Sequence, residues 1–334
     1  MSSKLSNVLD RYKRHEIINK IIDDKIKNAK NKCLYPIKAG LYTLKGNKPD
    51  LYPIKAGLYT LNDVILLYKR IGVISSYGSV FLSEIKDNKK KYTFATKIQL
   101  LTDDTYNELH FLKLITQKSI TYKNIHLPLM YNNLECNYLN KNDERLPPNL
   151  KDPEYKDVNN YYSIFVELAN GDLCNYLNKN KITIKKLNNA LSQCFIGLLS
   201  CHRLKIIHND SHWCNFLFHK IDNSHLSCFK YIYKDLVFYI ENIGLNWVIW
   251  DFGLSTKVSL FGHDNIQYDY ARLIISILEK SKLEPSLYDN YLLDILENGI
   301  EAYNTDYDII KYLLKKKLLF SDKQIGDIIT TIIL

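Results

Sequence analysis

The chain has 334 residues, of which 46% are hydrophobic and 24% charged, so it can bury a large core and global disorder is excluded. Its formal charge of +9, from 45 Lys and Arg against 36 Asp and Glu, favours anionic partners such as nucleotides and acidic peptides. No apolar run approaches the roughly 18–20 residues of a membrane-spanning helix, and the charged N-terminal segment contains no secretory signal. Seven cysteines without a Cys-x-x-Cys pair indicate a reducing compartment, so we expect a soluble intracellular protein without membrane insertion.

The first 64 residues are expected to hold one helix and a duplicated segment. Apolar residues recur every three or four positions over 3–30, which predicts a helix packed on the rest of the protein. The sequence LYPIKAGLYTL then occurs twice, at 34–44 and 51–61, a period of 51 − 34 = 17 residues. Two copies are too few for a solenoid. We expect a surface appendage, with a docking motif as the alternative.

Strand-like runs follow from residue 65. We expect strands at 66–73, 79–85, 92–98 and 162–168, a turn at 86–91, a helix at 105–116, and a long Asn-rich loop with three prolines at 131–160. The remainder is expected to be mainly helical, with helices at 173–178, 184–204, 268–280 and 288–303. A β-rich part followed by an α-rich part predicts an α+β protein of two lobes with a cleft between them.

Two motifs in the second part carry chemistry. His208-Asn209-Asp210 follows two apolar residues, Asn215 stands five positions after Asp210, and a second apolar strand runs into Asp251-Phe252-Gly253. Phosphoryl transfer needs a group that orients the acceptor hydroxyl and takes its proton, together with hard oxygen ligands for Mg²⁺. We assign the first role to Asp210 and the metal to Asn215 and Asp251.

The upstream part supplies groups that could bind a nucleotide. Gly72, Gly78 and Val80 surround a tight strand turn whose backbone could approach phosphates. Lys97, on the third strand, would contact the α- and β-phosphates, and Glu108 on the next helix would hold its ammonium. The end of the 162–168 strand would present backbone groups to adenine. The residues expected there are Glu167 and Ala169, with Asp172 near the ribose.

On these motifs, residues 65–303 resemble a eukaryotic-type protein kinase, most closely the divergent haspin-like branch. Three features favour that branch: His212-Trp213 after the catalytic Asp, an insertion between the metal ligands that makes their spacing 251 − 215 = 36 positions, and a helix that begins Gln267-Tyr268-Asp269-Tyr270. The resemblance implies a small β-rich N-lobe over 65–168, a larger helical C-lobe over 169–334, ATP and Mg²⁺ as cofactors, and a Ser/Thr protein as substrate. In that family the Asp at position 269 braces the catalytic loop. The composition, biased toward Asn, Lys, Ile and Tyr, is typical of AT-rich genomes such as those of large DNA viruses, so a host cell or virion is an expected location.

The chain departs from the family at several positions. The glycine-rich turn has lost its middle glycine, and Asn209 replaces the Arg that receives an activation-loop phosphate. The segment 254–268 is short and contains no Ala-Pro-Glu, so we expect no switching by phosphorylation there. His212 stands where a Lys contacts the γ-phosphate. If its imidazole serves in protonated form, activity would depend on pH near ~6.5.

Two other functions stay open at this stage. A small-molecule phosphotransferase of the aminoglycoside or choline kinase kind shares the Asp-x-x-x-x-Asn spacing, often with a His two residues after the Asp. A pseudokinase scaffold would explain the lost glycine, although every charged group that the chemistry needs is present. Binding to nucleic acid is not expected, because no recognition motif accompanies the positive charge.

Overall fold

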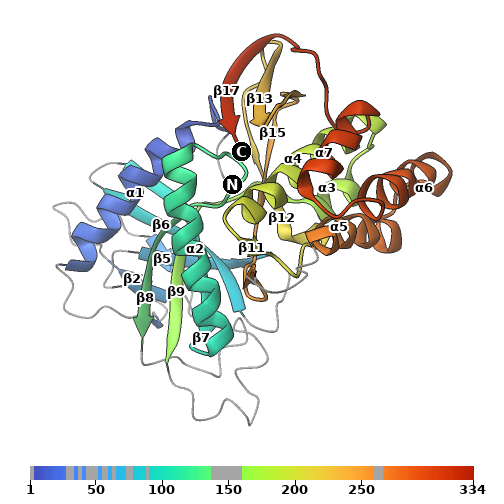
Figure 1. Ribbon diagram of the computed structural model, residues 1–334. Helices are drawn as coiled ribbons and strands as arrows, with labels where there is room; N and C mark the ends of the chain where they lie inside the picture. Colours follow the sequence, from blue (N-terminus) through green and yellow to red (C-terminus); the bar gives the residue numbers. More distant parts are fainter. Residues whose placement is uncertain are drawn as a thin grey trace.

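We describe a computed structural model of the chain, over residues 4–27, 34–36, 40–42, 52–54, 59–61, 65–72, 78–87, 90–136, 160–258 and 266–334. These residues form helices and sheets whose strand pairs are mostly antiparallel, which confirms the α+β class. One region is built on a large sheet with two helices, and a second region contains the other helices and several small sheets (Figure 1). We call these the sheet region and the helical region.

The sheet region contains seven strands in the order β1-β4-β5-β6-β7-β9-β8, with every neighbouring pair antiparallel. Their bounds are β1 Leu34–Pro36, β4 Tyr59–Leu61, β5 Ile65–Ile71, β6 Gly78–Asp87, β7 Lys90–Leu100, β8 Met130–Cys136 and β9 Tyr161–Val166. The strands expected at 66–73, 79–85, 92–98 and 162–168 are confirmed as β5, β6, β7 and β9, with modest shifts at their ends. The expected loop at 131–160 is wrong over its first six residues, which belong to β8 and pair with β9. The asparagines of β8 disfavour a strand, and pairing with β9 outweighs this local preference.

Two helices pack on opposite faces of this sheet. α1 (Asp10–Lys27) places Ile18, Ile21 and Ile22 in a core cluster with Phe94 and Ile98 of β7. α2 (Asp103–Tyr122) shares a different cluster with Ala95, which points the other way because side chains alternate along a strand. The predicted N-terminal helix is thus confirmed, although it begins at Asp10 and not at residue 3.

The two copies of the duplicated segment pair with one another. β1 from the first copy pairs with β4 from the second, while β2 (Gly40–Tyr42) pairs with β3 (Tyr52–Ile54), and both pairs are antiparallel. β4 also pairs with β5, so the duplication extends the edge of the large sheet.

The helical region is less helical than expected. Its helices are α3 Leu173–Lys179, α4 Ile184–Arg203, α5 Ile266–Lys280, α6 Pro285–Leu293, a π-helix at Asp294–Ile300 and α7 Asp306–Lys315. Three small sheets accompany them: β10-β12-β15 (Gly171–Asp172, Phe216–Lys220, Leu245–Ile249), β11-β16 (Ile206–Ile207, Thr256–Lys257) and β14-β13-β17 (Leu236–Glu241, Ser227–Tyr233, Asp327–Ile333). The insertion before Asp251 therefore forms a β13–β14 hairpin. The expected helix at 288–303 is divided between α6 and the π-helix, and α7 and β17 were not predicted.

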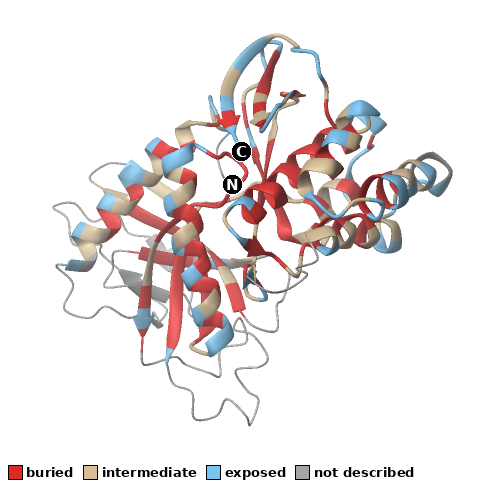
Figure 2. Ribbon diagram, in the orientation of Figure 1, coloured by how far each residue is buried: buried red, intermediate tan, exposed pale blue. Residues whose placement is uncertain are grey.

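A continuous core joins the two regions. Buried side chains of α2 and β9 belong to the same cluster as those of α4 and α5, and Figure 2 shows α4 as buried along most of its length. Among the described helices, none combines the length and the hydrophobicity that a membrane span requires.

Candidate active site

Lys97, on β7, is the centre of the candidate site. Its Nζ lies 2.6 Å from Glu108 Oε1 on α2 and 3.1 Å from Asp251 Oδ1 after β15. The Lys97 side chain is only 6% exposed. Gly78 leaves room for it, since a Cβ at that position would lie 3.1 Å from Lys97 Cε and 3.3 Å from Ile98 O. Three residues that are distant in the sequence thus form one charged cluster, in which Lys97 and Glu108 are buried while the Asp251 side chain is 37% exposed.

The neighbouring charges in this cluster favour the ionised forms of Lys97 and Asp251. Burial opposes the charge of Lys97, but Asp251 and Glu108 outweigh burial and raise the pKa of the ammonium. Burial likewise opposes the charge of Asp251, and Lys97 outweighs it and lowers the pKa of that carboxyl. Burial raises the pKa of Glu108, against the attraction of Lys97. The site therefore presents a fixed cation beside a carboxylate, as binding of a metal-bound phosphate requires.

Asp210 and Asn215 share the loop between β11 and β12 and bond to each other. Asn215 Nδ2 donates to Asp210 O at 2.7 Å and to Asp210 Oδ2 at 3.1 Å. A 3₁₀ turn at Trp213–Asn215 brings Asn215 back toward Asp210. Because the amide nitrogen is used in this way, Asn215 Oδ1 is the atom that could ligate a metal.

The peptide before Asp251 is bonded to the same loop. Trp250 N–H donates to Asn215 O at 2.8 Å, and Trp250 O lies 2.9 Å from Nε2 of the buried His208. Asp251 itself has φ 67°, a left-handed conformation that few non-glycine residues adopt. These contacts bring Asp251 and Asn215, the two expected metal ligands, onto adjacent segments.

Asp269 holds the loop from the other side, as the family resemblance implied. Its carboxylate accepts the backbone N–H groups of His208 at 2.7 Å and Asn209 at 2.9 Å. A residue that sequence reasoning missed supports it: His202 Nε2 lies 3.1 Å from Asp269 Oδ2, and His202 Nδ1 lies 2.7 Å from Asp306 Oδ1. The two carboxylates raise the pKa of His202 to about 9 in spite of its burial. The loop therefore rests on a buried charged network.

Two asparagines tie the segment after Asp251 to the site, and their roles were not predicted. Asn209 Nδ2 donates to Leu254 O at 3.0 Å and to Thr256 Oγ1 at 2.9 Å. Asn107, next to Glu108 on α2, donates to Ser255 O at 2.8 Å. These hydrogen bonds hold residues 254–256 against the 208–215 loop and against α2. The only available signal was the polarity of these residues beside the two motifs.

The surroundings of His212 affect the charge state of its imidazole. Burial lowers its pKa from the ordinary value, and the nearby Arg272 adds to this effect, although Asp210 opposes it. Its Nδ1 accepts the Cys214 N–H at 3.2 Å, and its Nε2 lies 3.6 Å from Asp210 Oδ2. The lowered pKa and the acceptor role of Nδ1 favour a neutral imidazole at neutral pH, against the attraction of Asp210. The pH dependence expected if a protonated His212 serves would therefore lie below ~6.5.

The residues expected to bind the nucleotide lie in different environments. Val80 pairs with Lys97 across β6 and β7, and Gly72 is exposed with φ 77°, while residues 73–77 between the glycines lie outside the described part of the chain. Ala169 is half-buried after β9. The Glu167 side chain is bound by Arg11 of α1, which leaves the backbone of this segment as the part expected to meet adenine. Asp172 caps α3, its Oδ1 accepting Asn175 N–H at 2.7 Å.

The donor set fits a nucleotide with its metal. Among the residues described, no three His, Cys, Asp or Glu side chains converge as a metal centre. A divalent ion here would rest on Asp251, on Asn215 Oδ1 and on oxygens of the nucleotide itself, which is how Mg²⁺ is commonly held beside phosphates. No protein-family model matches the sequence, and no curated protein matches it either.

Proposed function

We propose that this protein is a bilobal, haspin-like protein kinase that transfers the γ-phosphoryl group of ATP to Ser or Thr hydroxyls. The observation that carries the proposal is the position of Lys97, buried between Glu108 and Asp251 at 2.6 and 3.1 Å. A buried ion pair is often no more stabilising than apolar side chains of similar volume. Its presence here therefore favours a functional role.

Each group has a part in this reaction. Mg²⁺, when bound with ATP, would neutralise the charge that develops on the phosphates. Lys97 would hold phosphate oxygens, and Glu108 would keep its ammonium in place. Asp210, fixed by Asn215 at 3.1 Å, would orient the acceptor hydroxyl and accept its proton. Asp251 and Asn215 would ligate the metal.

The hydrogen bonds of Asn209 and Asn107 support a site that is assembled without a phosphorylated activation loop. They fasten residues 254–256 directly to the catalytic loop and to α2. The helix that carries Glu108 is therefore linked to the segment after Asp251, and both would stay in place in the unmodified protein.

Transfer of labelled γ-phosphate tests the proposal. Purified protein with Mg-ATP should label a generic protein substrate, and Asp210→Asn should lower the rate by about 10²–10⁴-fold, because it removes the proton acceptor. Asp235→Asn, an exposed aspartate in the turn between β13 and β14, is the matched control and should retain activity.

Other outcomes would identify another function. Label that appears on a small alcohol and on no protein would favour a small-molecule phosphotransferase. Failure to bind Mg-ATP in calorimetry would leave only a scaffold.

A further inference from the structure

The N-terminal segment, residues 4–27, contacts both regions of the protein. Leu5 N–H donates to Lys220 O at 2.9 Å and Leu5 O accepts from Asp222 N–H at 3.0 Å, both at the end of β12. Further along, Arg14 bonds to Thr93 O on β7, and His15 Nε2 lies 2.8 Å from Met130 O on β8. We call residues 4–27 the strap, because they run from the helical region across to the sheet region.

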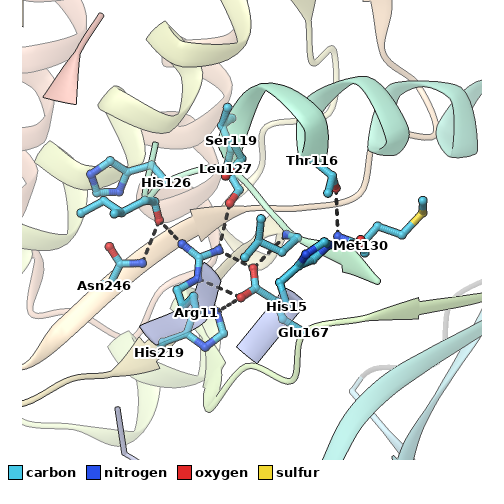
Figure 3. Close-up of polar contacts among 12 residues, drawn as sticks. Arg11, His15, Thr116, Ser119, His126, Leu127, Met130, Glu167, His219 and Asn246 are labelled. Atoms are coloured by element: carbon cyan, nitrogen blue, oxygen red, sulfur yellow. Dashed lines mark hydrogen bonds and ion pairs between the residues drawn. The ribbon is translucent and has the colours of Figure 1, made fainter. Parts of the chain in front are cut away.

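Arg11 is the most deeply buried charged residue of the strap. It is 3% exposed, and its guanidinium is surrounded by acceptors (Figure 3). Nε donates to Glu167 Oε2 at 2.8 Å and Nη2 to Glu167 Oε1, while Nη1 and Nη2 donate to Ile125 O and to Leu127 O. This is the bidentate geometry in which Arg binds carboxylates most strongly.

The Glu167 carboxylate contacts two further segments as well as Arg11. Besides Arg11, its carboxylate accepts Leu129 N–H at 3.0 Å and lies 3.2 Å from Nε2 of His219 on β12. Figure 3 shows Arg11 between the 125–129 connection, Glu167 and His219. Burial opposes the charge of Glu167, but Arg11 and His219 outweigh it and hold the pKa of the carboxyl far below its usual value. The pair is therefore ionised, and each partner depends on the other.

The backbone beside Glu167 is fixed at both ends. Glu167 N–H donates to Leu129 O at 3.1 Å, and Asn170 N–H donates to Phe218 O at 2.7 Å. Between them lies Ala169, where the proposed function has adenine bound by backbone groups. Through Arg11 and Glu167 the strap thus reaches the short connection between the two regions.

We propose that Arg11 is a positioning residue for nucleotide binding: by holding Glu167 it fixes the 167–170 connection in the conformation that receives adenine. This inference rests on the proposed function. It differs from a merely stabilising role, because a residue that only stabilised the fold would leave the affinity of the folded protein for nucleotide unchanged.

Arg11→Lys tests the inference, with Arg14→Lys as the matched control. Lysine keeps a positive charge near Glu167, so the carboxylate is not left unpaired, but one ammonium cannot reproduce the planar fork that spans Glu167, Ile125 and Leu127. Arg14 lies one turn further along the same helix and bonds only to Thr93 in the sheet region. Mg-ATP binding is measured by calorimetry, and backbone amide exchange at 167–170 is measured in the nucleotide-free protein.

We expect Arg11→Lys to weaken Mg-ATP binding about tenfold, to raise the KM for ATP with kcat at saturation retained, and to accelerate exchange at residues 167 and 170. Arg14→Lys should change none of these. Equal affinity and equal exchange in the Arg11→Lys and unaltered proteins would overturn the inference alone. Failure of the unaltered protein to bind Mg-ATP would overturn the proposed function and this inference together.

Discussion

The buried His202 gives the sharpest prediction for the pH dependence of stability. It lies in α4 between Asp269 of α5 and Asp306 of α7, with its side chain 2% exposed, and the Tyr270 hydroxyl bonds to the same Asp306 oxygen at 2.6 Å. Burial alone would lower its pKa, but the two carboxylates raise it from 6.5 to about 9. The folded protein therefore binds this proton more tightly than the unfolded chain does.

The sign and size of the effect follow from linkage. Because the folded pKa is raised, the stabilisation is fully present below pH 6.5 and is lost as the pH rises through about 9. A shift from 6.5 to about 9, at ~1.36 kcal/mol per unit, corresponds to about 3 kcal/mol of unfolding free energy. This is a large fraction of the roughly 5–15 kcal/mol that stabilises a typical domain.

Denaturant unfolding of the unaltered protein and of His202→Gln across this range measures the effect. Glutamine retains a hydrogen-bond donor but does not titrate. The unfolding free energy of the unaltered protein should fall by about 3 kcal/mol more than that of the variant between pH 6.5 and 9. Parallel pH profiles for the two proteins would refute the charged state assigned to His202.

Two further predictions concern packing. Gly78→Ala should lower the rate of phosphoryl transfer while leaving the fold intact. The added Cβ would lie 3.1 Å from Lys97 Cε and displace the ammonium. Transfer at the unaltered rate would contradict the claim that Gly78 makes room for Lys97. Ile332→Ala should cost about 2–5 kcal/mol of unfolding free energy, since this side chain of β17 is 0% exposed, whereas Ile333→Ala, at a position 73% exposed, should change it by less than about 0.5 kcal/mol. Equal losses in denaturant titrations of these two variants would show that β17 is not packed as described.

Local pattern was sufficient for the elements that carry the motifs. A short run rich in β-branched and aromatic residues predicted β7, and three- and four-residue spacing predicted α2. The contact between Lys97 and Glu108 was expected from the chemistry of phosphate binding. The hairpin of β13 and β14 also had a signal that was not used: aromatic and β-branched runs on either side of Lys234-Asp235, with Lys234 at φ 54° in the turn.

Side-chain direction and charge state could not be derived from the sequence in the same way. Glu167 was expected to serve the nucleotide through its backbone, and nothing in the sequence indicated that its carboxylate would bind Arg11, which is 156 positions away. For His212 the sequence left a protonated form open, whereas burial lowers the pKa of its imidazole. Both cases have one physical origin: the partners of a buried polar group are set by tertiary packing, and neighbouring residues in the sequence do not reveal them.

The parallel pairing of β17 with β13 has a consequence for the kinetics of folding. Ile332 pairs with Tyr231, and these residues are 332 − 231 = 101 positions apart, so a long loop must close before the sheet gains its third strand. Contacts of such sequence separation form slowly. The hairpin between the proposed metal ligands should therefore be among the last parts to acquire its protection, and until then Phe229 and Tyr231 would lie beside an open strand edge at which two partly folded chains could pair.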